Sequence, residues 1–169
     1  MSSTSVPVIR PEMARDATQV HDVLKSAFES DSEARLVERL RAEGDIVLAL
    51  VGETQGGLVG YVAFPRLTLT TDGRNSPAVG LAPVGVRPDR QRNGIGTALI
   101  RAGLARLKDR GEALIFVLGE PDYYGRFGFS ILPAYESPYA GPYFQALRLT
   151  PNAPVAGVVT YPKPFSELG

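Results

Sequence analysis

The sequence predicts a mixed α/β or α+β fold in a single domain. Apolar residues near the N-terminus recur at helical spacing, whereas the middle of the chain holds short apolar runs that are typical of strands. A strand, a helix and a second strand follow one another between residues 79 and 118, which indicates a βαβ unit with a right-handed crossover. The chain has 169 residues and a globular composition, which fits one domain spanning residues 1–169.

The first thirty residues predict one strand and one helix. Residues 1–5 are small and polar, and we expect them to be disordered. Val6–Arg10 can form a strand, although Pro7 and Pro11 restrict it to a sheet edge because proline cannot donate to a ladder. The apolar face of the following helix comprises Val20, Val23, Leu24, Ala27 and Phe28.

A second helix is predicted directly after the first. Ser30 and Glu33 match the S-x-x-E capping box, in which the two side chains satisfy the first free backbone N–H groups of a helix. Gly44 supplies the stop signal at the other end. The residues expected to point inward are Leu36, Val37 and Leu40.

Three apolar runs in the middle of the chain predict strands at Ile46–Gly52, Leu58–Phe64 and Val79–Val86. Glu53–Gly57 is rich in turn residues, so the first two runs are expected to form a hairpin. Thr71–Pro77 is polar and is expected to be a loop. We therefore expect mainly antiparallel strands before the βαβ unit.

The third run is unusual because Pro83 and Gly85 interrupt it, which indicates a broken strand or a close backbone approach. A helix is then predicted at 94–110 and a strand, buried on both faces, at Ala113–Leu118. A short helix at 121–127 and a last strand at 155–161 complete the prediction. Residues 130–154 give no clear pattern.

Composition excludes several kinds of chemistry. The absence of cysteine excludes disulfides, thiolate metal sites and a cysteine nucleophile, and the single histidine, His21, excludes multi-histidine metal centres. The formal net charge is zero, so we expect neither nucleic acid nor a membrane surface as partner. The longest apolar runs have six residues, whereas a membrane span needs about 20. With no apolar signal core at the N-terminus, we expect a cytoplasmic protein.

The most informative segment is Gln91–Gly96, a glycine turn that leads directly into the predicted helix. Gly94 and Gly96 have no side chains, so a ligand can approach the backbone there. The first N–H groups of a helix have no internal partner and lie at the positive end of its dipole. Together these features predict an anion site, most naturally one for a phosphate.

The local charge agrees with an anion site, because residues 87–110 include seven basic and only two acidic residues in a neutral protein. Two common phosphate motifs do not fit. A Walker loop needs Gly-Lys-Ser/Thr, whereas Thr97 follows Gly96 directly. A dinucleotide fingerprint needs a small residue at the position of Leu99. The turn alone also allows an ordinary helix start surrounded by solvated arginines.

Three motifs resemble the GNAT N-acetyltransferase superfamily. Gln91–Gly96 matches the family's Q/R-x-x-G-x-G/A signature, and Val86–Pro88 matches its V-x-P lead-in. Tyr123–Phe129 matches the late pattern of an aromatic, a tyrosine, three residues and Gly-Phe. A bacterial subgroup of this family carries an L-G-x-P-x-Y-Y-x-R-F-G-F segment, here Leu118–Phe129, and a Gly-x-x-x-Tyr-x-x-x-Phe stretch, here Gly157–Phe165.

The resemblance implies the GNAT fold: a mixed, mostly antiparallel sheet of about seven strands, whose fourth and fifth strands splay apart, flanked by about four helices. It also implies acetyl-CoA as co-substrate, with the pyrophosphate on the glycine turn, the pantetheine arm along the fourth strand and the thioester in the gap between the strands. The residues that it assigns to coenzyme binding are Val84, Gly85, Val86, Gln91, Arg92, Asn93, Gly94, Ile95, Gly96, Thr97 and Arg126.

The reaction implied is direct transfer of an acetyl group to an amine, with a backbone N–H near Val84–Val86 stabilising the oxyanion. Tyr124 occupies the family's general-acid position, and a phenol with a pKa of about 10 is protonated at neutral pH. Tyr123 and Tyr124 are adjacent, so one is expected to face the core and the other the cleft. Glu120 flanks the site and is the carboxylate we assign to catalysis, although the general base is not identified by the sequence.

The other carboxylates considered as bases are Asp122, Glu29 and Asp31, each of which also fits a surface or capping role. A small-molecule or peptide amine remains open as acceptor, and so does a homodimer. The loops Thr70–Pro77 and Pro133–Gln145 are expected to shape the acceptor pocket. An aromatic wall or a dimer contact is suggested by Tyr135, Tyr139, Tyr143 and Phe144.

Two other functions fit the same motifs. A non-catalytic acyl-CoA sensor or interaction domain would have the same fold. A module that holds a different nucleotide phosphate would use the same glycine turn.

Overall fold

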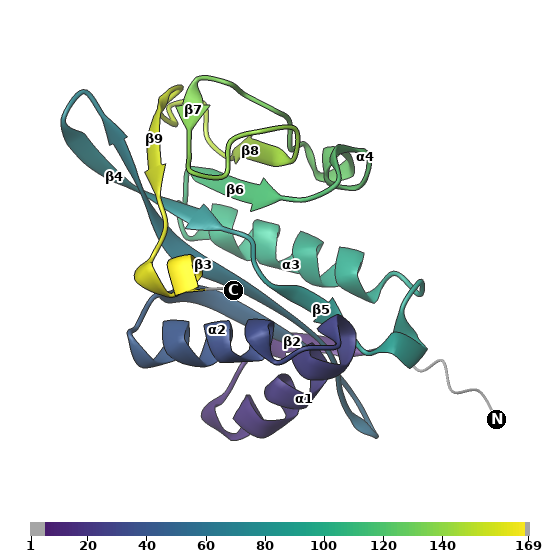
Figure 1. The fold of residues 1–169 in the computed structure, drawn as a ribbon. Coiled ribbons are helices and arrows are strands. Elements are labelled where there is room, and N and C mark those ends of the chain that lie inside the picture. Colours follow the sequence, from purple (N-terminus) through teal and green to yellow (C-terminus); the bar gives the residue numbers. More distant parts are fainter. Residues whose placement is uncertain (1–5, 168–169) are drawn as a thin grey trace.

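The computed structural model describes residues 6–167, so the expected disorder of residues 1–5 lies outside the described residues (Figure 1). The strands are β1 (Val8–Pro11), β2 (Ile46–Thr54), β3 (Gly57–Thr71), β4 (Arg74–Gly80), β5 (Val84–Val86), β6 (Leu114–Leu118), β7 (Tyr135–Glu136), β8 (Phe144–Arg148) and β9 (Gly157–Thr160). The α-helices are α1 (Ala17–Phe28), α2 (Ser32–Ala42), α3 (Ile95–Asp109) and α4 (Pro121–Tyr124). Short 3₁₀ turns are η1 (Ala14–Asp16), η2 (Pro88–Arg90), η3 (Gly125–Phe127) and η4 (Lys163–Glu167).

The nine described strands form one sheet, whose main path runs β1-β2-β3-β4-β6-β8. The β4–β6 and β7–β9 pairs are parallel and the other pairs are antiparallel, as a mixed fold predicts. There are more strands than the expected seven because the third apolar run divides into β4 and β5, and because residues 130–154 contribute β7 and β8. The predicted edge position of the first strand is confirmed.

Helices cover both faces of the sheet, with α3 on one side and α1 and α2 on the other (Figure 1). Strand β2 contributes side chains to both faces of the sheet, because side chains of successive strand residues point to opposite faces. Leu48 and Leu50 belong to the cluster that contains the inward residues of α3, whereas Ala49 and Val51 pack with those of α1 and α2. This two-sided burial explains why β2 is an almost continuous apolar run.

Helix α2 begins later than predicted. Its N-cap is Asp31, without a side-chain capping bond, so the expected capping box of Ser30 and Glu33 is wrong. The hydroxyl oxygen of Ser30 instead accepts from the backbone N–H of Ser32 at 3.2 Å. As a result the side chain of Glu33, in the first turn of α2, is not used at the helix start.

Thr71–Pro77 was expected to be a loop, and this is wrong. Strands β3 and β4 continue through this segment as a long hairpin, in which Thr71 pairs with Arg74. Asp72 and Gly73 form the turn with φ values of 51° and 78°. An Asp-Gly pair with positive φ at both positions matches a two-residue hairpin turn, and this signal was available in the sequence.

The interruption at Pro83 and Gly85 marks a real break in the strand. Strand β4 ends at Gly80, and β5 begins at Val84 and pairs with β3 over Gly60–Val62. A Cβ atom on Gly85 would lie 3.1 Å from Leu24 and 3.2 Å from Phe28, so α1 approaches the backbone closely at this point.

Strand β6 pairs with β4 only at the C-terminal end of β4, where Val79 and Gly80 lie opposite Ile115 and Phe116. No pairing between β5 and β6 occurs among the described strands. The two strands therefore splay apart beyond Gly80, as expected for the fourth and fifth strands of the fold.

Candidate active site

The N-terminus of α3 opens into a hollow of about 380 Å³, which we call the α3 notch. Its lining residues are Val86, Arg90, Gln91, Arg92, Gly94, Ile95, Gly96, Thr97, Tyr123 and Arg126. Three of these residues are arginines and none is acidic. The notch therefore has the size and charge of a site for a phosphate group.

The backbone at the notch is shaped by two positive φ angles, 67° at Arg92 and 78° at Gly94, the N-cap of α3. The first bond within the helix runs from the N–H of Ala98 to the carbonyl of Gly94. The N–H groups of Ile95, Gly96 and Thr97 therefore have no partner within the helix and lie at the positive end of its dipole. Among residues 6–167, no side chain caps this end of α3.

Side chains of the turn support this backbone. The amide of Gln91 donates to the carbonyl of Val86 at 2.9 Å, and that of Asn93 donates to the carbonyl of Arg90 at 3.2 Å. The guanidinium of Arg126 lies 4.3 Å from the centre of the Tyr123 ring. These contacts connect β5, the glycine turn and the segment after β6 around one hollow.

Strand β5 presents unpaired backbone to the gap. The N–H of Arg87 donates to Val59, and the N–H of Ala63 donates to the carbonyl of Pro83. Hydrogen-bonded pairs alternate along an antiparallel ladder, so the N–H and C=O groups of Gly85 point to β3, whereas those of Val84 and Val86 point the other way, toward β6. The carbonyl of Val86 accepts from the Gln91 amide, which leaves both groups of Val84 and the N–H of Val86 for a ligand. A ligand in the gap can form a ladder with β5 there.

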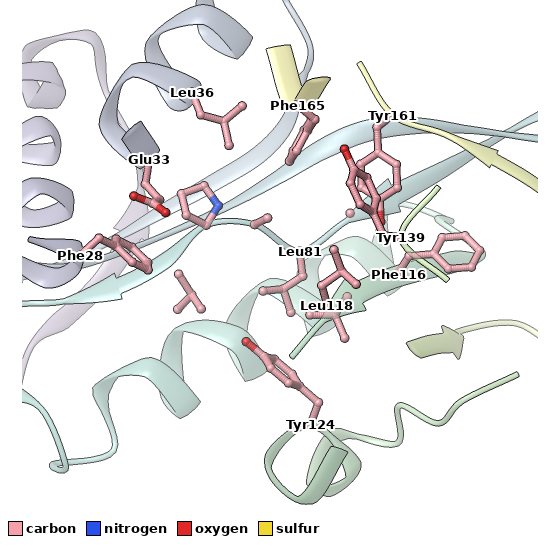
Figure 2. A pocket seen from close by; sticks show the side chains of 15 residues that line it. Phe28, Glu33, Leu36, Leu81, Phe116, Leu118, Tyr124, Tyr139, Tyr161 and Phe165 are labelled. Carbon is pink, nitrogen blue, oxygen red and sulfur yellow. The ribbon is translucent and has the colours of Figure 1, made fainter. Parts of the chain in front are cut away.

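A second hollow of about 420 Å³, which we call the central cavity, lies at the splay between β5 and β6 (Figure 2). Its lining residues are Phe28, Glu33, Leu36, Gly80, Leu81, Ala82, Pro83, Val84, Phe116, Val117, Leu118, Tyr124, Tyr139, Tyr161 and Phe165. Apolar and aromatic side chains dominate this lining, as in most sites for small ligands.

The hydroxyl of Tyr124 points into the central cavity (Figure 2). Burial raises the pKa of Tyr124 to about 12, because the apolar surroundings disfavour the phenolate. Its ring lies on Gly119, where a Cβ atom would be only 2.2 Å from Cε2 of Tyr124. The Nε2 amide of Gln145, which is fully buried, donates to the carbonyl of Gly119 at 2.9 Å and so fixes that backbone.

The adjacent residues Tyr123 and Tyr124 line different hollows. Tyr123 lies in the α3 notch, where its hydroxyl is 2.8 Å from the hydroxyl of Thr97. The planes of the two rings are 87° apart. The expectation that one of them faces the core is therefore replaced by an arrangement in which Tyr123 lines the notch and Tyr124 lines the cavity.

The residues predicted to bind the coenzyme are distributed over several places. Most of them line the α3 notch, namely Val86, Gln91, Arg92, Gly94, Ile95, Gly96, Thr97 and Arg126. Val84 lines the central cavity, and Gly85 faces α1. Asn93 does not line the notch, and its side-chain amide donates to the carbonyl of Arg90.

The structure does not bring Glu120 into the central cavity. Glu120 is exposed, and its backbone carbonyl accepts from the N–H groups of Tyr123 and Tyr124 at the start of α4. Asp122, Glu29 and Asp31 do not line the cavity either. The ring of His21 pairs with Glu38 at 2.7 Å, on α1 and α2.

Sequence reasoning missed the carboxylate and most of the rings that do line the cavity. Glu33 was assigned to a helix cap, and the Gly157–Phe165 motif that holds Tyr161 and Phe165 was given no role. Of the proposed aromatic wall only Tyr139 lines the cavity, because Tyr135 and Phe144 pack on Phe116 in the core. The hairpin segment Thr70–Pro77 contributes nothing to the lining.

Within residues 6–167, no group of three or more metal-binding side chains could hold an ion. No helix in the same part of the chain has the length and apolar character needed to cross a membrane.

The family of this chain follows from a comparison of its sequence with models of known protein families. The family model for the acetyltransferase (GNAT) domain matches residues 8–132. The chain belongs to the GNAT acetyltransferase family. The matched span contains β1 through the end of α4, and therefore the α3 notch and Tyr124.

Two Escherichia coli proteins are similar to this GNAT protein, one along nearly its whole length and one over about 70% of it. The uncharacterized N-acetyltransferase YhbS of Escherichia coli K12 is 35% identical over 167 residues, which cover 95% of this chain and 99% of the relative. The uncharacterized N-acetyltransferase YjhQ of the same organism is 36% identical over 131 residues, which cover 76% of this chain and 71% of the relative.

Two solved structures share the fold of this GNAT protein. That of Escherichia coli YhbS in complex with CoA has a TM-score of 0.89 and 33% identity, and covers 100% of this chain and 97% of the other. That of a GNAT family acetyltransferase from Brucella melitensis in complex with acetyl-CoA has a TM-score of 0.80 and 36% identity, covering 94% and 97%.

Proposed function

We propose that this GNAT protein transfers the acetyl group of acetyl-CoA to a primary amine in a complex that holds both substrates. The observation that carries the proposal is that β5 joins an anion site to an apolar cavity, with Val86 lining the α3 notch and Val84 the central cavity. An elongated molecule with phosphates at one end and a thioester at the other fits this arrangement. Relatives at 33% and 36% identity bind CoA and acetyl-CoA, which supports the same cosubstrate here.

In the proposed complex the N–H groups of Ile95, Gly96 and Thr97 bind the pyrophosphate, and Arg92 and Arg126 add positive charge. The outward C=O group of Val84 and N–H group of Val86 pair with the amides of the pantetheine arm, as a further strand would. This pairing places the thioester beside the Tyr124 hydroxyl.

The chemical step uses the Tyr124 hydroxyl and a backbone N–H of β5, together with the positioning of both substrates. The unprotonated amine attacks the thioester carbonyl, so that a C–N bond forms and the C–S bond breaks, and the amine proton passes to water. The outward N–H of Val84, which lines the central cavity, stabilises the oxyanion. Tyr124 donates its proton to the leaving sulfur and recovers it from solvent. Direct transfer agrees with the absence of cysteine, because no thiol acyl-enzyme can form.

Release of free CoA tests the function. We expect thiol release from acetyl-CoA to depend on an added primary amine and acetylated amine to accumulate in equal amount, as measured with a thiol reagent and by mass spectrometry. Acetyl-CoA is also expected to raise the thermal midpoint, whereas ATP and NAD are not, because a ligand of the folded state stabilises it. Binding without turnover of any amine would instead identify an acyl-CoA sensor.

The raised pKa of Tyr124 makes a prediction about alkaline pH. Burial shifts the pKa upward to about 12, so the phenol keeps its proton through pH 10, where an ordinary tyrosine is about half ionised. With an acceptor whose amine pKa is below about 8, we expect kcat to rise as the amine loses its proton and then to stay level between pH 9 and pH 10, in short initial-rate assays. A fall of about twofold over that interval would show that the general acid has an ordinary pKa.

A further inference from the structure

We infer that the acceptor is a small arylalkylamine that carries no carboxylate, and that Glu33 binds its ammonium group. This inference rests on the proposed function and names the substrate class of the same site. It is drawn from the lining of the central cavity, which must hold the acceptor next to the thioester.

Glu33 reaches the cavity because of its position on α2. It lies in the first turn, three residues before Leu36, so both side chains project from the same face of the helix, and both line the cavity. Glu33 is half-buried, and no described residue forms a hydrogen bond or an ion pair with it. A half-buried carboxylate without a partner is a ready site for a cation.

Charge in the rest of the lining excludes many acceptors. Among the fifteen lining residues Glu33 is the single carboxylate, and there is no lysine, arginine or histidine. The phenols of Tyr124 and Tyr161 stay neutral at physiological pH, because burial raises both pKa values. A carboxylate on the acceptor would find no counter-charge and would lie near Glu33, whereas a polyamine would have one carboxylate for several cations.

The apolar part of the cavity is built from rings. Tyr139 and Tyr161 meet edge to face with centroids 4.9 Å apart, and Tyr161 and Phe165 meet at 5.2 Å. Such arrangements extend readily to a further ring, which adds attraction beyond the area that it buries. This aromatic wall distinguishes an arylalkylamine from a purely polar amine.

The carboxylate of Glu33 and the aromatic wall lie at different ends of the central cavity (Figure 2). Glu33 and Phe28 lie at one end of the cavity, Tyr139 and Tyr161 lie at the other, and the hydroxyl of Tyr124 points in from the opposite side. An amine bound at Glu33 with its ring against the aromatic wall spans the cavity, and its ammonium loses one proton to solvent before the nitrogen attacks the thioester. A single orientation of the arylalkylamine therefore pairs its ammonium with Glu33 and packs its ring on the aromatic wall.

A series of acceptors tests the inference on the wild-type protein: a matched set of phenyl compounds, with spermidine and a peptide with a free N-terminus for comparison. Phenethylamine and phenylalanine differ by one carboxylate, and phenylalanine amide has the size of phenylalanine without that charge. We expect kcat/KM, measured across pH to account for the different amine pKa values, to be about 100-fold higher for phenethylamine than for phenylalanine. Phenylalanine amide is expected within about tenfold of phenethylamine.

The outcomes separate the two proposals. Equal rates across the series, or spermidine, phenylalanine or a peptide N-terminus as the best acceptor, would overturn the substrate class and leave acetyl transfer standing. Release of no CoA with any amine would overturn the proposed function and the inference together.

Substitution of Glu33 tests the ammonium site separately. We expect Glu33→Gln to raise KM for phenethylamine at least about tenfold and to leave KM for acetyl-CoA unchanged, while Glu33→Asp recovers part of the loss. The control is Glu29→Gln, which removes the same charge from an exposed position before α2 and should change neither value. Equal effects of Glu33→Gln on both substrates, in a variant with a wild-type thermal midpoint, would rule out ammonium binding by Glu33.

Discussion

Replacement of Tyr124 by phenylalanine is expected to lower kcat about 100-fold or more without changing the Kd for acetyl-CoA. The hydroxyl is the group that the proposed reaction uses, and it points into the central cavity, whereas Tyr124 does not line the α3 notch. The ring itself packs on Gly119 and meets Phe129 with centroids 5.9 Å apart, and phenylalanine preserves both contacts. The loss should therefore appear in the chemical step and not in folding or in coenzyme binding.

Stopped-flow or steady-state thiol release measures kcat, and calorimetry measures the Kd. Tyr143→Phe is the matched control, because Tyr143 is 52% exposed and lines neither hollow. Wild-type turnover in Tyr124→Phe would remove the residue from the mechanism. A weaker Kd for acetyl-CoA with unchanged kcat would make Tyr124 a binding residue instead.

Replacement of Gly94 by aspartate is expected to weaken acetyl-CoA binding about 100-fold. A Cβ atom at this position meets nothing within 4 Å, so the new carboxylate projects into open space at the N-terminus of α3, where the pyrophosphate is proposed to bind. It would compete for the same N–H groups and repel the phosphates. The positive φ of 78° adds strain, although aspartate adopts this conformation more readily than most residues.

Gly94→Asn separates charge from shape. Asparagine has nearly the size of aspartate and tolerates the same φ, but it carries no charge. We expect its Kd for acetyl-CoA to rise less than about tenfold, with calorimetry as the measurement and the thermal midpoint as the check on folding. If the two variants weaken binding equally, the notch is sensitive to bulk alone and the pyrophosphate lies elsewhere.

Local signals were sufficient wherever a short segment determines its own structure. The glycine turn Gln91–Gly96, the helix after it and the break at Pro83 were all predicted, because backbone conformation and unsatisfied N–H groups depend on neighbours in sequence. The Asp72–Gly73 turn was equally local, and was missed because the polar residues around it were taken for a loop. The solvent-exposed part of a hairpin is polar for the same reason that loops are.

The sequence by itself determined the family, the anion site at the start of α3 and the identity of Tyr124 as the tyrosine to test. Only the tertiary structure decided which carboxylate faces the cavity. Glu120 is three residues from Tyr123 yet is exposed, whereas Glu33 comes from a helix some ninety residues away in the chain and lines the same cavity. The physical reason is that a cavity between splayed strands is closed by whichever elements pack across it, here α1, α2 and the segment after β9, and long-range packing leaves no local pattern in the sequence.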